Sequence, residues 1–279
     1  MDFYTLFPDI QPWVASLQTT YPVTLLNQTQ WGFAAIQAVH LLALGLLGGC
    51  VILLNMRLMG VGMTSATPAL MERNLRPWLI SGVAAVLLTG IVIGMLNPEK
   101  LYTSPAFFTK MIAMVSALTF SFAVTNNVAR QESGVKLSPV VMAMAAIAFG
   151  LWLWSIGVFA VVEGVNPGTI HMIVAAFAIL FAFGKRTRII AAIVLGIIVV
   201  AGAIVTHGIY NLDDNYEMVL TTEVWFVRAA AVAAVAFMGY EIFTGTTEDD
   251  RGATVKLIAL FSILSWVTVA AAGRWIGFS

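Results

Sequence analysis

The chain has 279 residues, of which 60% are hydrophobic and 10% are charged. A soluble domain carries about 25% charged residues on average, so this composition indicates a protein whose solvent is largely lipid. Fourteen basic and fourteen acidic residues cancel to a formal net charge of zero, and without a basic field nucleic acid is excluded as a partner. The single cysteine, Cys50, excludes an internal disulfide framework and any CxxC motif.

Residues 1–30 differ from the rest of the chain because they combine aromatic and acidic residues with three prolines. Pro8, Pro12 and Pro22 interrupt any long helix. No basic region precedes an apolar stretch, so the segment is not a cleavable signal peptide. Aromatic rings prefer the boundary between lipid and water. We therefore expect an interfacial segment on the outer surface of the membrane.

Eight stretches of the remaining sequence can cross a membrane, since a helix needs about 20 mostly apolar residues to span a hydrocarbon layer of about 30 Å. Proline, glycine or charged residues bound each stretch and favour turns. The predicted spans are 33–57, 78–96, 106–128, 138–162, 168–184, 188–210, 223–243 and 256–276. The sequence therefore predicts an all-α polytopic membrane protein with about eight transmembrane helices.

Lysine and arginine are unevenly distributed among the predicted loops. Basic residues near helix ends are retained on the cytoplasmic side of a membrane. They gather in alternate loops, whereas the intervening loops hold mainly acidic residues. The basic residues of these loops are Arg57, Arg73, Arg76, Arg130, Lys136, Lys185, Arg186, Arg188, Arg251 and Lys256. The pattern predicts a bacterial inner membrane protein with both termini in the periplasm.

The two halves of the chain share a spacing between a histidine and a following arginine. His40 precedes Arg57 by 17 residues, and His171 precedes Arg188 by the same interval. At 1.5 Å per helical residue this interval is about 25 Å. Both histidines are therefore predicted near the outer edge of the hydrocarbon layer.

A second shared pattern opens the third and seventh spans, where two aromatic residues precede Lys110 and Arg228. Counting back 21 residues from each cation gives Thr89 in the first half and His207 in the second. Each half holds an even number of crossings, so the two copies have the same orientation, and we expect parallel four-helix repeats. The predicted repeats cover 31–162 and 163–279.

Five ionisable residues are predicted to share the outer third of the membrane. At the centre of a spanning helix such a residue costs about 2.5–3.5 kcal/mol on insertion scales, so each calls for a reason. Neutral imidazole is a good ligand of haem iron, and the helices of a bundle supply such ligands from facing positions. The five residues are His40, Lys110, His171, His207 and Arg228.

The leading hypothesis is therefore a b-type haem near the periplasmic face, with His40 and His171 as axial ligands. Lys110 and Arg228 would neutralise its propionates. In a variant of this hypothesis His171 pairs with His207, because the fifth and sixth spans form a hairpin. Such a protein would pass electrons between a quinone or other membrane donor and a periplasmic partner. It would be a subunit of a homo- or hetero-oligomer more than an autonomous enzyme.

Two other classes of function stay open. In the first, the histidines pack between helices, and Lys110 and Arg228 extend to the membrane surface. The protein would then be a structural or assembly subunit without a cofactor. Copper handling is the third reading, because thioethers favour Cu(I). Met95, Met111, Met114 and Met172 are predicted near the level of the histidines. No HExxH, GxSxG, P-loop or dinucleotide motif indicates catalysis.

A resemblance to an uncharacterised bacterial family of multi-pass membrane proteins is carried by six short runs. They are VHLLALG (39–45), RLMG (57–60), RPW (76–78), TG (89–90), FFTK (107–110) and AGRWIGF (272–278). More remotely, a histidine in an early span and a lysine opening a later one are similar to copper resistance protein D-like and HemJ-like membrane proteins. That likeness implies haem or copper at His40, with Lys110 near the site.

Overall fold

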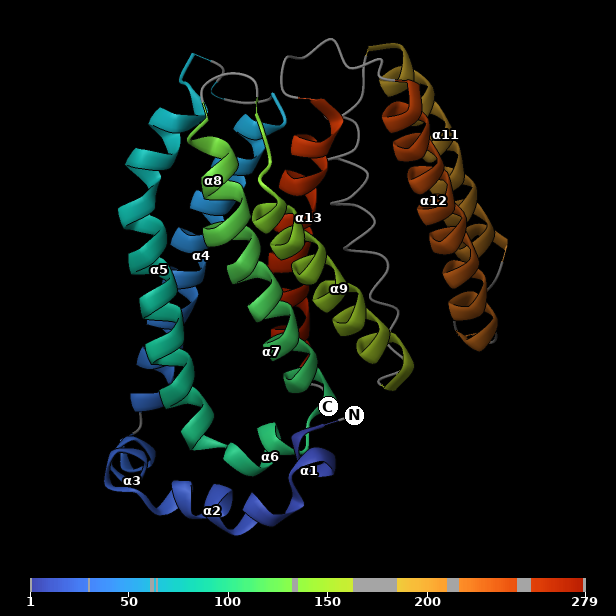
Figure 1. The fold of residues 1–279 in the computed structure, drawn as a ribbon. Coiled ribbons are helices and arrows are strands. Elements are labelled where there is room, and N and C mark those ends of the chain that lie inside the picture. Colours follow the sequence, from blue (N-terminus) through green and yellow to red (C-terminus); the bar gives the residue numbers. More distant parts are fainter. Residues whose placement is uncertain are drawn as a thin grey trace.

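A computed structural model describes residues 2–29, 31–60, 63, 65–131, 135–162, 185–209, 216–244 and 252–277. The described residues are largely helical (Figure 1). In chain order the elements are α1 (Phe3–Leu6), η1 (Pro8–Ile10), α2 (Gln11–Ser16), η2 (Leu17–Thr19), α3 (Tyr21–Gln28), α4 (Gly32–Leu58), α5 (Pro68–Leu96), α6 (Pro98–Tyr102), α7 (Pro105–Leu118), η3 (Thr119–Thr125), α8 (Asn126–Ala129), α9 (Pro139–Val162), α11 (Lys185–Ala203), η4 (Ile204–Ile209), α12 (Tyr216–Thr244) and α13 (Gly252–Trp275).

Six of the described helical segments are long and apolar enough to cross a membrane, which confirms an all-α polytopic membrane protein. They are Gly32–Leu58, Pro68–Leu96, Pro105–Ala129, Pro139–Phe159, Arg186–Thr206 and Thr254–Trp275. The predicted fifth span, 168–184, lies outside the described residues. Helix α12 covers the predicted seventh span but is not one of the six. The count of eight and the internal repeat stay predictions.

Proline and a capping hydroxyl begin two of the long helices. Pro68 opens α5 and Pro105 opens α7, where the missing N–H costs nothing because the first turn has no acceptor for it. The preceding Thr67 and Ser104 hydroxyls accept hydrogen bonds from the backbone N–H groups three residues ahead. The proline and the capping hydroxyl therefore fix the residue at which each of these two helices begins.

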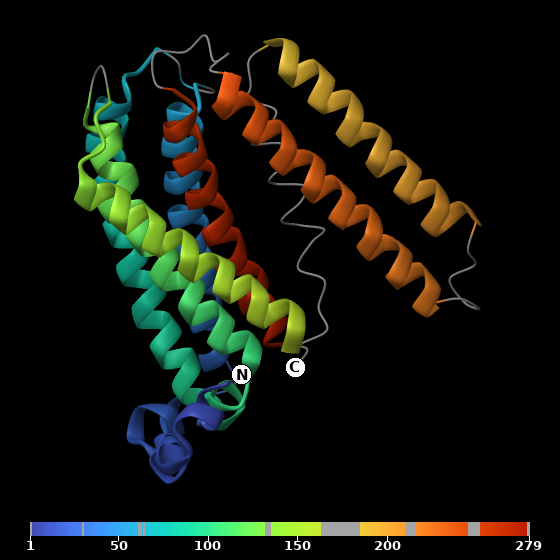
Figure 2. The ribbon, with the colours of Figure 1, turned by 45° about the vertical axis from the view of Figure 1, so that its right-hand side comes forward.

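Helices α4, α5, α7, α9 and α13 form a bundle, and the α11–α12 hairpin stands beside it in both views (Figures 1 and 2). Large side chains such as Phe120, Leu58 and Leu260 are almost fully buried between the helices of the bundle. Helix α13, the last in the chain, packs against α7 and α4. The final helix of the second predicted half thus lies among helices of the first half.

The short helices α1 to α3 lie across the end of the bundle where both termini are found, which we call the terminal end (Figure 1). The Tyr102 hydroxyl donates a hydrogen bond to the Phe7 carbonyl. The Phe3 ring lies 5.1 Å from the Phe108 ring, centroid to centroid, in an edge-on arrangement. These contacts fasten the N-terminal segment to α6 and α7.

An ion pair between Arg130 and Glu72 lies at the opposite end of the bundle, which we call the loop end. The Arg130 guanidinium donates a 2.8 Å hydrogen bond to Glu72 Oε1, and the Glu72 side chain is almost fully buried. The carboxylate holds the pKa of Arg130 above its usual value through this hydrogen bond and its charge. Removing either partner would leave the other charge uncompensated.

Candidate functional site

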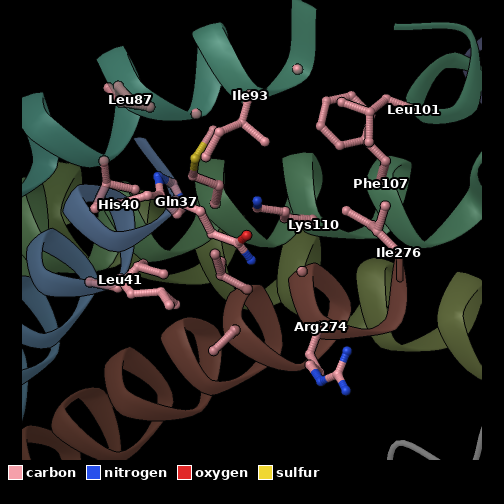
Figure 3. Close-up of a pocket in the computed structure, with 18 of the residues that line it drawn as sticks. Gln37, His40, Leu41, Leu87, Ile93, Leu101, Phe107, Lys110, Arg274 and Ile276 are labelled. Carbon is pink, nitrogen blue, oxygen red and sulfur yellow. The ribbon is translucent and has the colours of Figure 1, made fainter. Parts of the chain in front are cut away.

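A cavity of about 620 Å³ lies between α4, α5, α7 and α13 near the terminal end (Figure 3). Most of its walls are apolar, which suits a hydrophobic ligand. We call it the His40 cavity. Its polar lining consists of Gln37, His40, Asn97, Lys100, Lys110 and Arg274. Its described lining includes two lysines and one arginine and no Asp or Glu, so it favours an anion.

The His40 imidazole is held in one orientation by a threonine from the neighbouring helix. Its Nδ1 lies 2.7 Å from Thr89 Oγ1, and that hydroxyl lies 2.6 Å from the Ala85 carbonyl oxygen. Since the hydroxyl gives its only proton to the carbonyl, it accepts the Nδ1–H of a neutral imidazole. The lone pair of Nε2 then has no hydrogen-bond donor among the described residues and is available to a ligand.

Glycine residues let two of the ionisable side chains of the cavity, His40 and Lys110, lie close to the neighbouring helices. A Cβ on Gly90 would lie 3.4 Å from His40 Cε1, and a Cβ on Gly273 would lie 3.5 Å from Lys110 Nζ. Figure 3 shows Lys110 and Gln37 extending into the cavity from α7 and α4. Lys110 has no ion pair or hydrogen bond within the described parts of the chain, so its charge is available to an anionic ligand.

A second cavity of about 360 Å³ adjoins the first and shares the His40 and Lys110 side chains with it. We call it the side cavity. Met95, Met111 and Met114 line it, and the N-terminal segment contributes Ile10, Val14 and Leu17 to its wall. Three of the methionines predicted at the histidine level therefore do surround the same space as His40.

The structure brings together two of the five predicted site residues. His40 and Lys110 line the same cavities. His171 lies outside the described residues. His207 belongs to the π-helix η4, but its side chain is not among those that the structure describes. Arg228 is not part of the described lining of either cavity. It is exposed on α12, and its guanidinium carbon lies 4.9 Å from the Trp225 ring centroid.

Sequence reasoning missed four polar residues of the His40 cavity, namely Gln37, Asn97, Lys100 and Arg274. Gln37 precedes His40 by three residues, so the helical period alone places them on one face. Arg274 belongs to the terminal AGRWIGF run, which sequence reasoning used only as a family signature. Nothing in the sequence pairs α13 with α4 and α7, so its place at the cavity could not be foreseen.

Within the described residues, no three His, Cys, Asp or Glu side chains gather as they would around a metal ion. A metal at His40 would therefore need ligands of another kind or from outside these residues. The fold and cavity define an α-helical membrane protein with a cation-lined pocket near one end of its bundle.

The chain belongs to a family of unknown function, DUF6644, whose model matches residues 18–166 and 184–279. No curated protein and no solved structure matches the chain.

Proposed function

We propose that this protein binds b-type haem in the His40 cavity and transfers electrons as a membrane subunit. The observation that carries the proposal is His40 itself: Nδ1 is held by Thr89, and the lone pair of Nε2 is free at a mostly apolar cavity. Histidines that bind metals have this arrangement, because the second nitrogen donates to a neighbouring acceptor and fixes the ring.

The charges of the cavity support an amphipathic dicarboxylate such as haem. Lys110, Lys100 and Arg274 line the mostly apolar space, and cations of this kind would pair with the two propionates. The volume of about 620 Å³ lies within the range of cavities that enclose small organic cofactors. The haem would supply the one-electron chemistry, while the chain holds it and excludes water.

His171 remains the proposed second ligand, with His207 as its alternative partner, as the sequence spacing predicts. The contact between His40 and Thr89 suggests how His171 and His207 would be arranged in the second half. Thr89 and His207 occupy equivalent positions in the proposed repeats, so by the same equivalence His207 would orient His171 as Thr89 orients His40. The electron donor would be a quinone or another membrane component.

The proposed location is the inner membrane of a bacterium, with the terminal end facing the periplasm. Arg57, Arg73, Arg76 and Arg130 all lie toward the loop end, which is the side that positively charged residues mark as cytoplasmic. Since the His40 cavity lies near the terminal end, the proposed haem would exchange electrons with a partner at the periplasmic face.

Copper handling is the second candidate, because the side cavity combines His40 with three methionines, Met95, Met111 and Met114. Imidazole and thioether together form a soft ligand set that suits Cu(I). This reading uses the same histidine as the haem proposal. The two are therefore separated by what is bound, and not by which residue binds it.

The test is a reduced-minus-oxidised absorbance spectrum of the detergent-purified protein, reconstituted with haem and compared with a His40→Gly variant. We expect a b-type band that the variant loses and that added imidazole restores. Leu42→Ala is the matched control, because Leu42 lies on the same helix with 76% of its surface exposed. It should keep the full band.

A featureless spectrum from folded wild-type protein would overturn the haem proposal. Metal analysis then decides the second candidate. Copper retained by the wild type and lost in the Met111→Leu/Met114→Leu double variant would establish Cu(I) binding. Protein without haem or copper would leave a structural or assembly subunit.

A further inference from the structure

The side cavity opens on the surface of the bundle that faces lipid. Ile91 and Ile10 both line the cavity, and they are 61% and 44% exposed. Ile91 belongs to α5, which is long and apolar enough to cross a membrane, so lipid chains surround its exposed side. A ligand can therefore enter the side cavity sideways from the bilayer.

The walls of the side cavity suit hydrocarbon better than water. Three of its described lining residues have polar side chains: His40, Tyr102 and Lys110. The Tyr102 hydroxyl already donates to the Phe7 carbonyl, and Nδ1 of His40 is already bonded to Thr89. An ordered water molecule needs two to four polar partners, and most of this wall offers none. Most of the space is therefore suited to a hydrocarbon chain.

One side of this apolar space holds a cation. Lys110 lines both cavities, and its ammonium group has no acidic partner among the described residues. A Cβ on Gly273 would lie 3.5 Å from Lys110 Nζ, so the ammonium group lies beside α13. Figure 3 shows the Lys110 side chain extending into the His40 cavity. A charge among apolar walls is costly, and an anion beside it would remove that cost.

The size of the side cavity suits a single hydrocarbon chain. Its volume of about 360 Å³ equals that of about 12 water molecules at about 30 Å³ each, and a methylene group is of similar size. One acyl chain fits this space, and its far end can pass the opening at Ile91 into the bilayer. The two acyl chains of a phospholipid would not fit together.

We propose that the side cavity binds a long-chain fatty acid from the membrane, with its carboxylate at Lys110 and its chain between the N-terminal segment, α5 and α7. The carboxylate would form a charge-assisted hydrogen bond with the ammonium group. An uncharged molecule of the same shape would leave that charge uncompensated. This binding does not depend on haem, although a haem propionate at Lys110 would compete with the carboxylate.

The test is equilibrium binding of radiolabelled oleate or oleyl alcohol to the full-length protein in phosphatidylcholine nanodiscs, without added haem and with binding to empty nanodiscs subtracted. The two molecules share one hydrocarbon chain and differ in the charge of the headgroup. We expect one oleate per chain at saturation and roughly tenfold weaker binding of the alcohol, as for the loss of one charge-assisted hydrogen bond. Equal binding of the two, or no saturable oleate binding, would overturn the proposal.

Variants of Lys110 assign the carboxylate to its position. Lys110→Met removes the charge from a side chain of similar shape and should weaken oleate binding roughly tenfold, whereas Lys110→Arg should retain it. Lys136→Met is the matched control, because Lys136 is an exposed lysine near the loop end. Unchanged oleate affinity in folded Lys110→Met protein would contradict the assignment. If that variant does not fold, the comparison of oleate with oleyl alcohol still decides.

Two further variants separate the fatty acid from the proposed haem. Met111 lines the side cavity but is not part of the described lining of the His40 cavity. Met111→Trp should therefore block the oleate chain and leave the haem band unchanged, whereas His40→Gly should lose the band and still bind oleate. Full oleate binding in folded Met111→Trp protein would overturn the proposal. Wild-type protein that binds oleate but takes up no haem would overturn the haem proposal alone.

Discussion

His40 and Thr89 form the contact on which the candidate site depends, and they are 49 residues apart in the sequence. Spacing alone predicted that His40 and Lys110 share a level, because each lies a known distance from a helix end. It did not predict the partner of His40. Helical periodicity fixes which face a residue occupies but not which helix that face meets. The sequence marked Thr89 as the counterpart of His207 and as part of a family run, and not as a partner of His40.

Thr89→Val tests this contact with little change in side-chain shape. The variant loses the acceptor for Nδ1–H, so the imidazole is free to turn. We expect bound haem to dissociate about 10 to 100 times more readily, as when the partner of a metal-binding histidine is removed. Haem transfer to apomyoglobin measures this rate. Thr89→Ser restores the hydroxyl and should behave as the wild type; equal rates for all three proteins would contradict the positioning role.

Helices α4 and α5 approach each other closely at one glycine. A Cβ on Gly82 would lie 3.2 Å from both the backbone nitrogen and the Cβ of Leu47, and Leu47 is 1% exposed. Backbone cannot give way as a flexible side chain can, so the distance between these helices depends on the missing side chain. The same pair of helices carries His40 and Thr89, and their packing therefore supports the site.

Gly82→Leu should destabilise the bundle by about 1–3 kcal/mol, since it forces a side chain into a filled interface. Thermal unfolding in detergent measures this loss as a lower midpoint. Gly150→Ala is the control, because nothing lies within 4 Å of the added Cβ on that exposed helix face. It should leave the midpoint unchanged or slightly higher. An unaltered midpoint in Gly82→Leu would show that α4 and α5 do not pack this closely.

Sequence patterns predicted individual helices better than their internal geometry. The predicted third span, 106–128, agrees closely with the segment Pro105–Ala129, because proline and a capping serine mark its start. The π-helix η3 within it was not foreseen. Composition does not distinguish a π turn from an α turn, since the difference depends on which carbonyl each N–H finds in the packed bundle.

At the scale of the whole molecule, the two ends of the bundle differ in charge and in cavities. Composition and hydropathy predicted an all-α membrane protein, and the described helices confirm this. The predicted division at residue 163 follows from the order of the spans along the sequence, which does not say how the helices pack. The position of α13 is an example. This helix belongs to the second half of the chain yet packs against α4 and α7 of the first.

The proposed orientation predicts which end of the bundle is reached from outside the cell. In a Cys50→Ala background, Thr103→Cys lies near the terminal end and Ser138→Cys near the loop end, both at exposed positions. We expect a membrane-impermeant maleimide to label position 103 in intact cells and position 138 only after permeabilisation. The reverse labelling would place the His40 cavity on the cytoplasmic side.

The position of α13 also sets the order in which the protein can be completed. A ribosome makes α4, α5 and α7 early, but the His40 cavity needs Trp266, Val269 and Arg274 from α13 for its remaining wall. The pocket is therefore unfinished until α13 has been made and has docked against α4 and α7. A cofactor loaded into this pocket would be received only after α13 has inserted, and not by a chain that holds α4, α5 and α7 alone.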